Sequence, residues 1–138
     1  MSAVGYDARP MNAALAGKVY PDALFEVDRD RVAAFRAVFD EPSGVPSTFV
    51  TAAEFTVIPV IIADPEFNLD FSRVLHGNQE YEFRRPLEEG EALVIRSRIE
   101  SIREMGANAF LVLVTELLEP SGEVVCTARS TLIERAVS

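Results

Sequence analysis

Two hydrophobic periods divide this chain into a first part typical of helices and a second part typical of strands. In the first part, apolar residues recur three and four positions apart at Val32, Phe35 and Phe39. Val38 widens this stripe, and Asp28 stands just before it as a candidate N-cap. The spacing predicts an amphipathic helix that follows a short extended piece and ends near residue 40.

The next segment, residues 49–62, is apolar on nearly every side. A helix of this kind is expected to be buried on most of its faces. Ser47 is its candidate cap, and Pro59 should kink or end it, because proline removes a backbone donor and clashes with the preceding turn. The abundance of Val, Ile and Thr leaves a buried strand as the competing interpretation, but the length of the run favours a helix.

From residue 73 onward, the pattern is strand-like, with apolar and polar residues alternating in most of the runs. The predicted strands cover residues 73–85, 92–104, 109–118 and 123–134. Short turn signals between them predict a meander of long antiparallel strands.

A sheet this long must have one face covered, and the apolar helix is the obvious cover. The chain is therefore expected to be an α+β protein in which a long antiparallel sheet wraps around a central buried helix, the hot-dog fold. Residues 20–138 would form this single domain, and residues 1–19 would be an irregular N-terminal segment.

Composition narrows the function classes further. The chain has 138 residues, of which 49% are hydrophobic and 25% are charged, as is typical of one globular domain. Its net charge of −9 argues against binding to nucleic acid or to an anionic membrane surface. The sequence shows neither a signal peptide nor an apolar run of ~18 residues, which favours a cytoplasmic protein. One cysteine and one histidine argue against a disulfide or a metal site, and we expect no cofactor.

Three stretches of the sequence, taken in order, resemble one known family. LHGNQEYEFRRPLEEGE at 75–91 is similar to the LHGEQ stretch and the following P-L-x-x-G-(D/E) of MaoC-like hydratases and dehydratases. VPSTFV at 45–50 is similar to the x-P-(P/S)-T-F start of their central helix, and FEVDRDRVAAFRAVFDE at 25–41 is similar to their opening segment. The resemblance covers roughly residues 20–135 and is closest to the N-terminal domain of FAS1-type dehydratases.

The resemblance implies a function in acyl-thioester chemistry. Members of the family hydrate trans-enoyl thioesters, or dehydrate (R)-3-hydroxyacyl thioesters, of coenzyme A or acyl carrier protein. In those relatives, one hot-dog unit carries an Asp and a His in the motif D-x-N-P-x-H, and the other unit helps to form the acyl tunnel. The two units occur fused in one chain, as separate subunits or as homodimers.

This sequence departs from the catalytic motif. Asp40 aligns with the Asp of the motif, but EPSGVPSTF follows it and contains neither Asn nor His. The resemblance therefore implies the acyl-thioester-binding component of a dehydratase or hydratase, in a homodimer or in a heterodimer with a catalytic MaoC-like subunit. Backbone donors for a developing oxyanion are expected near residues 47–50, at the start of the central helix.

Three ionisable residues are candidates for catalysis. Asp40 matches the motif position, although it can simply end the first helix. His76 lies on the LHG strand, where a structural donor is the more common role. Glu54 is the lone ionisable group in the apolar helix, and hot-dog thioesterases of other families place a carboxylate there. A simpler interpretation places Glu54 at the helix edge, paired with an arginine.

Four apolar residues of the central helix are candidates for lining an acyl pocket, namely Phe49, Phe55, Ile58 and Ile62. An apolar wall suits an acyl chain, whose burial yields ~0.8 kcal/mol per methylene group. Plain core packing is the simpler interpretation of each of them. Two alternative functions stay open, a stand-alone acyl-CoA thioesterase that uses Glu54 and a non-enzymatic acyl-binding homodimer.

Overall fold

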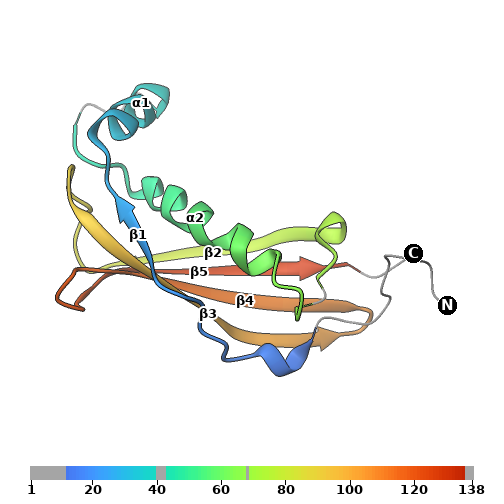
Figure 1. The fold of residues 1–138 in the computed structure, drawn as a ribbon. Coiled ribbons are helices and arrows are strands. Elements are labelled where there is room, and N and C mark those ends of the chain that lie inside the picture. Colours follow the sequence, from blue (N-terminus) through green and yellow to red (C-terminus); the bar gives the residue numbers. More distant parts are fainter. Residues whose placement is uncertain (1–11, 40–42, 68, 136–138) are drawn as a thin grey trace.

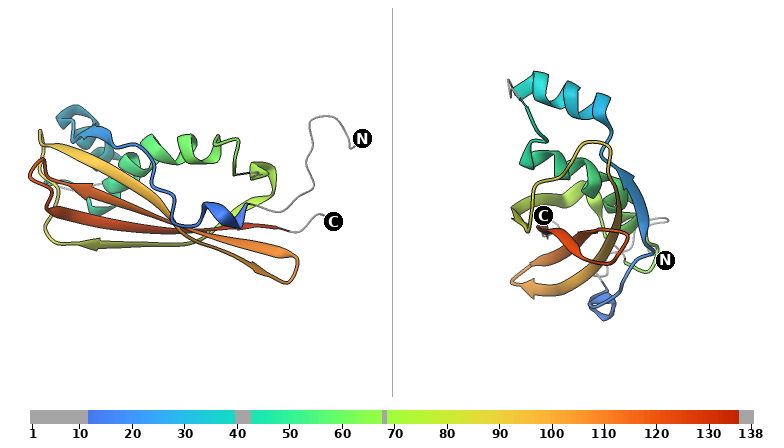
Figure 2. Two further views of the ribbon diagram at one scale, coloured as in Figure 1. Left: turned by 60° about the horizontal axis from the view of Figure 1, so that its bottom comes forward. Right: turned by 90° about the vertical axis from the view of Figure 1, so that its left-hand side faces the viewer.

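A single curved antiparallel sheet carries a helix on its concave face in the computed structural model, which describes residues 12–39, 43–67 and 69–135 (Figure 1). The strands are β1 (Ala23–Glu26), β2 (Val74–Phe83), β3 (Ala92–Met105), β4 (Asn108–Leu118) and β5 (Val124–Glu134). Their order in the sheet is β1-β3-β4-β5-β2, and every neighbouring pair is antiparallel. The sheet curls around helix α2 (Val50–Ile62), so the α+β arrangement of a sheet wrapped around a helix is confirmed (Figure 2).

The expected simple meander is wrong for β2. Strands β3, β4 and β5 follow one another through tight turns, but β2 pairs with β5 at the far edge of the sheet. Strands β2 and β3 are therefore three strand spacings apart, about 14 Å. Residues 84–91 can span roughly 25 Å when extended, which is enough to cross this distance. Alternation reveals which residues are strands, but it does not reveal which strands pair.

Helix α1 (Arg29–Phe39) begins as the sequence predicts, because Asp28 Oδ2 accepts a hydrogen bond from the backbone N–H of Arg31 at 2.9 Å. Val32 is fully buried, and Phe35 packs against the core. Val38 is 77% exposed, so its assignment to the apolar stripe is wrong. At about 100° per residue, Val38 lies about 120° around the helix from Val32. The side chain of Phe39 lies outside the described residues.

Helix α2 confirms that the apolar segment is a helix, although its start differs from expectation and Pro59 does not end it. A 3₁₀ turn (Ser47–Phe49) leads into α2, and neither element has a side-chain cap, so the prediction that Ser47 caps the helix is wrong. The helix also continues past Pro59 to Ile62. Pro59 has no N–H to donate to the carbonyl group four residues earlier. Pro59 lies on the exposed face of α2, so water can reach that carbonyl group instead.

Only one face of α2 is buried in the single chain. Ala53, Val57 and Ile61 face the sheet, whereas Phe55 is 65% exposed and Val60 is 57% exposed. The expectation that the helix is buried on most faces is therefore wrong for one copy of the chain.

The segment before β1 is tied to the end of α2 by a polar clamp. Asp64 Oδ2 accepts hydrogen bonds from Lys18 Nζ at 2.6 Å and from the Tyr20 hydroxyl at 2.7 Å. Residues 12–19 contain a 3₁₀ turn (Ala13–Leu15) and a single bridge from Val19 to β3, so the described part of the N-terminal segment packs on the domain. No helix formed by the described residues is long and apolar enough to cross a membrane.

Candidate functional site

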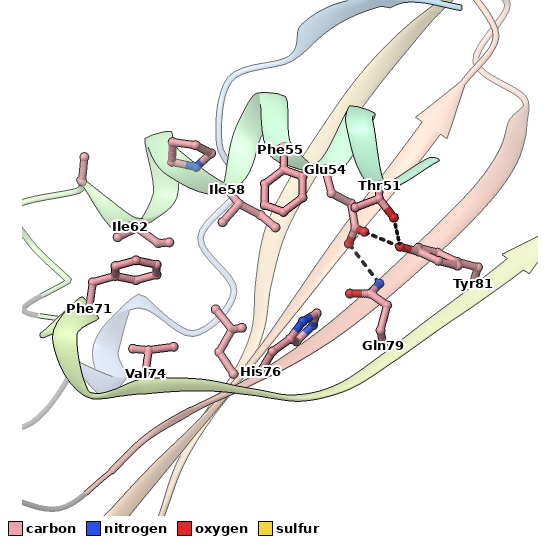
Figure 3. Close-up of a pocket in the computed structure, with 13 residues that line it drawn as sticks. Thr51, Glu54, Phe55, Ile58, Ile62, Phe71, Val74, His76, Gln79 and Tyr81 are labelled. Atoms are coloured by element: carbon pink, nitrogen blue, oxygen red, sulfur yellow. Dashed lines mark hydrogen bonds between the residues drawn. The ribbon is translucent and has the colours of Figure 1, made fainter. Parts of the chain in front are cut away.

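A groove with a volume of about 650 Å³ lies between α2 and β2. Its apolar part is lined by Phe55, Ile58, Ile62, Phe71, Val74 and Leu132. Its polar end is formed by Thr51, Glu54, Gln79 and Tyr81, and His76 stands on the β2 wall between the two parts (Figure 3). The groove is therefore amphipathic along its length, with hydrogen-bonding groups gathered at one end.

Helical spacing explains the α2 wall of the groove. Thr51, Glu54, Ile58 and Ile62 follow one another at intervals of three and four residues and therefore lie on one side of the helix. The same face thus carries polar groups near the start of α2 and apolar groups near its end. This gradient in the sequence produces the gradient along the groove.

A β-bulge at Gly77 explains the β2 wall. His76 and Gln79 are three residues apart and would point to opposite faces of a regular strand. The register of β2 against β5 shifts between His76 and Asn78, so both side chains face the groove. A Cβ atom at Gly77 would come within 2.8 Å of Ile133 Cδ1, so any larger residue at the bulge would require the Ile133 side chain to shift.

The carboxyl group of Glu54 is the centre of a hydrogen-bonded cluster at the polar end. Glu54 is 3% exposed. Its Oε1 accepts from the Tyr81 hydroxyl at 2.9 Å, and its Oε2 accepts from Gln79 Nε2 at 3.1 Å and from Ser130 Oγ at 2.9 Å. The hydroxyl groups of Thr51 and Tyr81 share a further hydrogen bond of 2.7 Å. We call these five residues the Glu54 cluster.

The Glu54 cluster differs from the arginine pair that the simpler interpretation expected. No ion pair to Glu54 forms among the described residues, and its partners are neutral donors from β2 and β5. Burial raises the pKa of Tyr81 to about 12, so this phenol keeps its proton at neutral pH. Burial likewise raises the pKa of Cys126 to about 12, as expected for an inert core thiol.

Three of the four predicted pocket residues line the groove, namely Phe55, Ile58 and Ile62. Phe49 does not. It is 2% exposed, and its ring packs edge-on against Phe35 with 5.5 Å between ring centroids. Phe49 belongs to the 3₁₀ turn before α2, so the helical face that lines the groove does not include it.

The three catalytic candidates have different places. Glu54 and His76 both line the groove, Glu54 as a buried group and His76 as an exposed one. Asp40 lies outside the described residues. The expected backbone donors near residues 47–50 are partly engaged, because Phe49 N–H donates to Pro46 O at 2.9 Å and Val50 N–H donates within the 3₁₀ turn.

Sequence reasoning missed four members of the cluster, Thr51, Gln79, Tyr81 and Ser130, as site residues. A signal existed for Ser130, which is a polar residue between the apolar residues Ala128 and Leu132 in the inward row of β5. Gln79 and Tyr81 are two positions apart and share a face, but alternation does not show which helix they meet. No cluster of His, Cys, Asp and Glu side chains suited to a metal ion occurs within 12–39, 43–67 and 69–135.

Comparison with known proteins places this architecture in one family. The sequence model described as FAS1-like, dehydratase domain region matches residues 17–128. A UPF0336 protein of Streptomyces coelicolor is 34% identical, and the alignment covers 91% of this chain and 96% of that protein. A UPF0336 protein of Saccharopolyspora erythraea is 29% identical over 94% of each chain.

Solved structures agree with the hot-dog fold. The structure of the HadBC (3R-hydroxyacyl-ACP dehydratase) complex of Mycobacterium tuberculosis contains a chain that matches with a TM-score of 0.74 and 21% identity, covering 86% of this chain and 96% of that one. A MaoC-like dehydratase matches with a TM-score of 0.75 and 21% identity, over 90% of this chain and 43% of its own length. These likenesses establish the fold, and the match over residues 17–128 establishes that the chain belongs to the FAS1-like dehydratase domain family.

Proposed function

We propose that this chain is the acyl-thioester-binding component of a (3R)-hydroxyacyl-thioester dehydratase or enoyl hydratase. A partner chain supplies the catalytic Asp and His. The observation that carries this proposal is the groove between α2 and β2, whose volume of about 650 Å³ falls in the range of small-molecule sites. Its apolar walls suit an acyl chain, since each buried methylene group contributes about 0.8 kcal/mol.

The need for a partner follows from the histidine count. The chain has one histidine, His76, and it stands on β2 rather than in the loop where the family motif D-x-N-P-x-H occurs. A proton acceptor with a pKa near neutrality is required to remove the proton next to the thioester carbonyl. A second hot-dog subunit that carries the motif provides one.

The edge of the sheet offers a place for that subunit. Strand β2 is an edge strand, and the exposed apolar side chains Phe55, Phe71 and Leu75 lie on or near it. Long unpaired edges invite pairing with another strand. His76, Gln79 and Tyr81 of β2 line the groove, so a partner on this edge would lie next to the acyl chain. The HadBC structure is described as a complex, which supports the existence of a partner chain.

The test measures the affinity of the purified chain for hexadecanoyl-CoA by titration calorimetry. The affinity of the wild type is compared with that of a variant that carries a charge in the groove. Ile58→Asp should weaken binding strongly, because a carboxylate would lie against the apolar chain. Val60→Asp is the matched control, since Val60 lies on the exposed face of α2 outside the groove and should bind as the wild type does. Equal binding by both variants would overturn the proposal.

A stand-alone thioesterase is the second candidate, because Glu54 lines the groove and such enzymes use a carboxylate on this helix. The assay is the release of free thiol from hexadecanoyl-CoA by the chain alone. We expect no release above background. Release of thiol that disappears in a folded Glu54→Ala variant would establish the thioesterase. Binding of the thioester by a homodimer, with no reaction either alone or with any partner chain, would establish the acyl-binding homodimer.

A further inference from the structure

Phe71 is an exposed aromatic residue that lines the apolar end of the groove. It lies in the 3₁₀ turn Phe71–Arg73, between α2 and β2, and it is 60% exposed. Figure 3 shows it with Ile62 and Val74 at the end of the groove opposite the Glu54 cluster. A large apolar side chain that is exposed in a groove leaves surface that an apolar ligand can bury.

The turn that carries Phe71 is fixed by polar contacts to the end of β5. Asp70 Oδ2 accepts a hydrogen bond from Arg73 Nε at 3.0 Å, and the Asp70 N–H donates to Glu134 Oε2 at 2.7 Å. The Arg135 N–H donates to the carbonyl oxygen of Arg73 at 2.9 Å. None of these bonds involves the ring of Phe71, so the ring can be replaced while the turn keeps its anchors.

The place of Phe71 in the groove corresponds to a definite length of acyl chain. Thr51 and Ile62 are eleven residues apart on the groove side of α2, which is about 16 Å at 1.5 Å per residue. An extended alkyl chain advances about 1.25 Å per carbon, because C–C bonds of about 1.5 Å meet at tetrahedral angles. With the thioester carbonyl at the polar end, roughly carbon 14 lies beside Ile62 and Phe71, whereas a chain of ten carbons ends near Ile58.

We propose that Phe71 sets the chain-length preference of the groove, because its ring contacts only the tails of acyl chains that extend beyond roughly carbon 13. The inference rests on the proposed acyl-binding function and adds a specificity-determining residue to it. Phe71 then strengthens the binding of long chains alone, whereas Ile58 contacts long and short chains alike.

The test compares hexadecanoyl-CoA with decanoyl-CoA on the purified chain by titration calorimetry. Phe71→Ala should weaken the binding of hexadecanoyl-CoA roughly tenfold, or about 1.4 kcal/mol, because the last carbons lose their aromatic wall, and it should leave the affinity for decanoyl-CoA unchanged. Val60→Ala removes exposed apolar surface of α2 outside the groove and should leave both affinities unchanged.

The pattern of losses separates the failure of this inference from the failure of the proposed function. Unchanged binding of hexadecanoyl-CoA by Phe71→Ala would overturn the assignment of Phe71. An equal loss for both thioesters would also overturn it, because Phe71 would then support the groove as a whole. Binding of neither thioester by the wild type would overturn the proposed function as well.

A fluorescent side chain at the same position gives a second measurement, which decides if Phe71→Ala does not fold. The chain contains no tryptophan, so Phe71→Trp introduces a single indole and keeps an aromatic ring. Saturation with hexadecanoyl-CoA should shift its emission to shorter wavelengths, since the alkyl tail replaces water around the ring, and decanoyl-CoA should not shift it. The same shift with both thioesters, or no shift with bound hexadecanoyl-CoA, would contradict the placement of the tail at Phe71.

Discussion

The hydroxyl of Tyr81 connects the two walls of the groove, and its removal gives a measurable loss of stability. In Tyr81→Phe, the ring stays in place, but the hydrogen bonds to Glu54 at 2.9 Å and to Thr51 at 2.7 Å are lost. Glu54 is buried, so it loses a donor that water replaces poorly, and this loss costs about 1–3 kcal/mol. Thr51 is only half-buried, so the loss of its hydrogen bond to Tyr81 should cost about 0.5 kcal/mol. The expected total is about 2 kcal/mol.

Urea unfolding measures this difference. With a slope of roughly 2 kcal/mol per M for a chain of this size, the midpoint of Tyr81→Phe should lie about 1 M below that of the wild type. The protein concentration is kept constant, because association would shift the apparent stability. Thr51→Val should be destabilised by only about 0.5–1 kcal/mol, since Glu54 keeps all its donors.

A change at the exposed neighbour of Tyr81 tests whether the loss of stability is specific to the Tyr81 hydroxyl. Glu82→Gln changes the exposed neighbour of Tyr81 on the outer face of β2 and should stay within about 0.5 kcal/mol of the wild type. If Tyr81→Phe also stays within that limit, the hydroxyl does not hold Glu54, and the reasoning about the cluster fails.

Two further predictions concern the clamp at Asp64 and the buried thiol. Hydrogen bonds from Lys18 and Tyr20 lower the pKa of Asp64 from 3.8 to about 2, so its contribution to stability is present above pH 4 and is lost as the pH falls toward 2. The free energy of unfolding of Asp64→Asn, measured by urea unfolding, should therefore lie below that of the wild type by about 1–2 kcal/mol at pH 7, and the gap should close as the pH falls to about 2; a constant gap would refute the clamp. Cys126 is fully buried and its pKa is raised to about 12, so iodoacetamide at pH 8 should alkylate it only in the unfolded chain; equal rates in the native and unfolded chain would contradict its burial.

The sequence predicts the elements of this fold well, because hydrophobic periodicity depends on neighbouring residues. The apolar run that contains Val57 and Ile61 could only be a buried helix or strand, and its length decided for a helix. The four strand-like runs became β2, β3, β4 and β5 within a few residues of their expected bounds. Strand pairing could not be predicted in this way, because β2 pairs with β5 and not with β3, the next strand in the sequence.

Only part of the candidate site could be predicted, because local patterns do not show which distant segments of the chain meet. Ile58 and Ile62 follow from the face of one helix, and both line the groove. The Glu54 cluster joins residues that are 25 and 76 positions apart in the chain, from a helix and two strands. Its geometry also depends on the bulge at Gly77, which turns Gln79 inward, and no local pattern reveals the register of a bulge.

The most direct test of the account is equilibrium dialysis of the purified chain against trans-2-hexadecenoyl-CoA, followed by chemical analysis of the ligand. The proposed function predicts that the protein retains the thioester and returns it unchanged, because it assigns the acyl chain to the groove and the catalytic Asp and His to a partner. Recovery of the ligand as 3-hydroxyhexadecanoyl-CoA would contradict the absence of catalysis in this chain. Failure to retain the ligand would contradict the acyl-binding function itself.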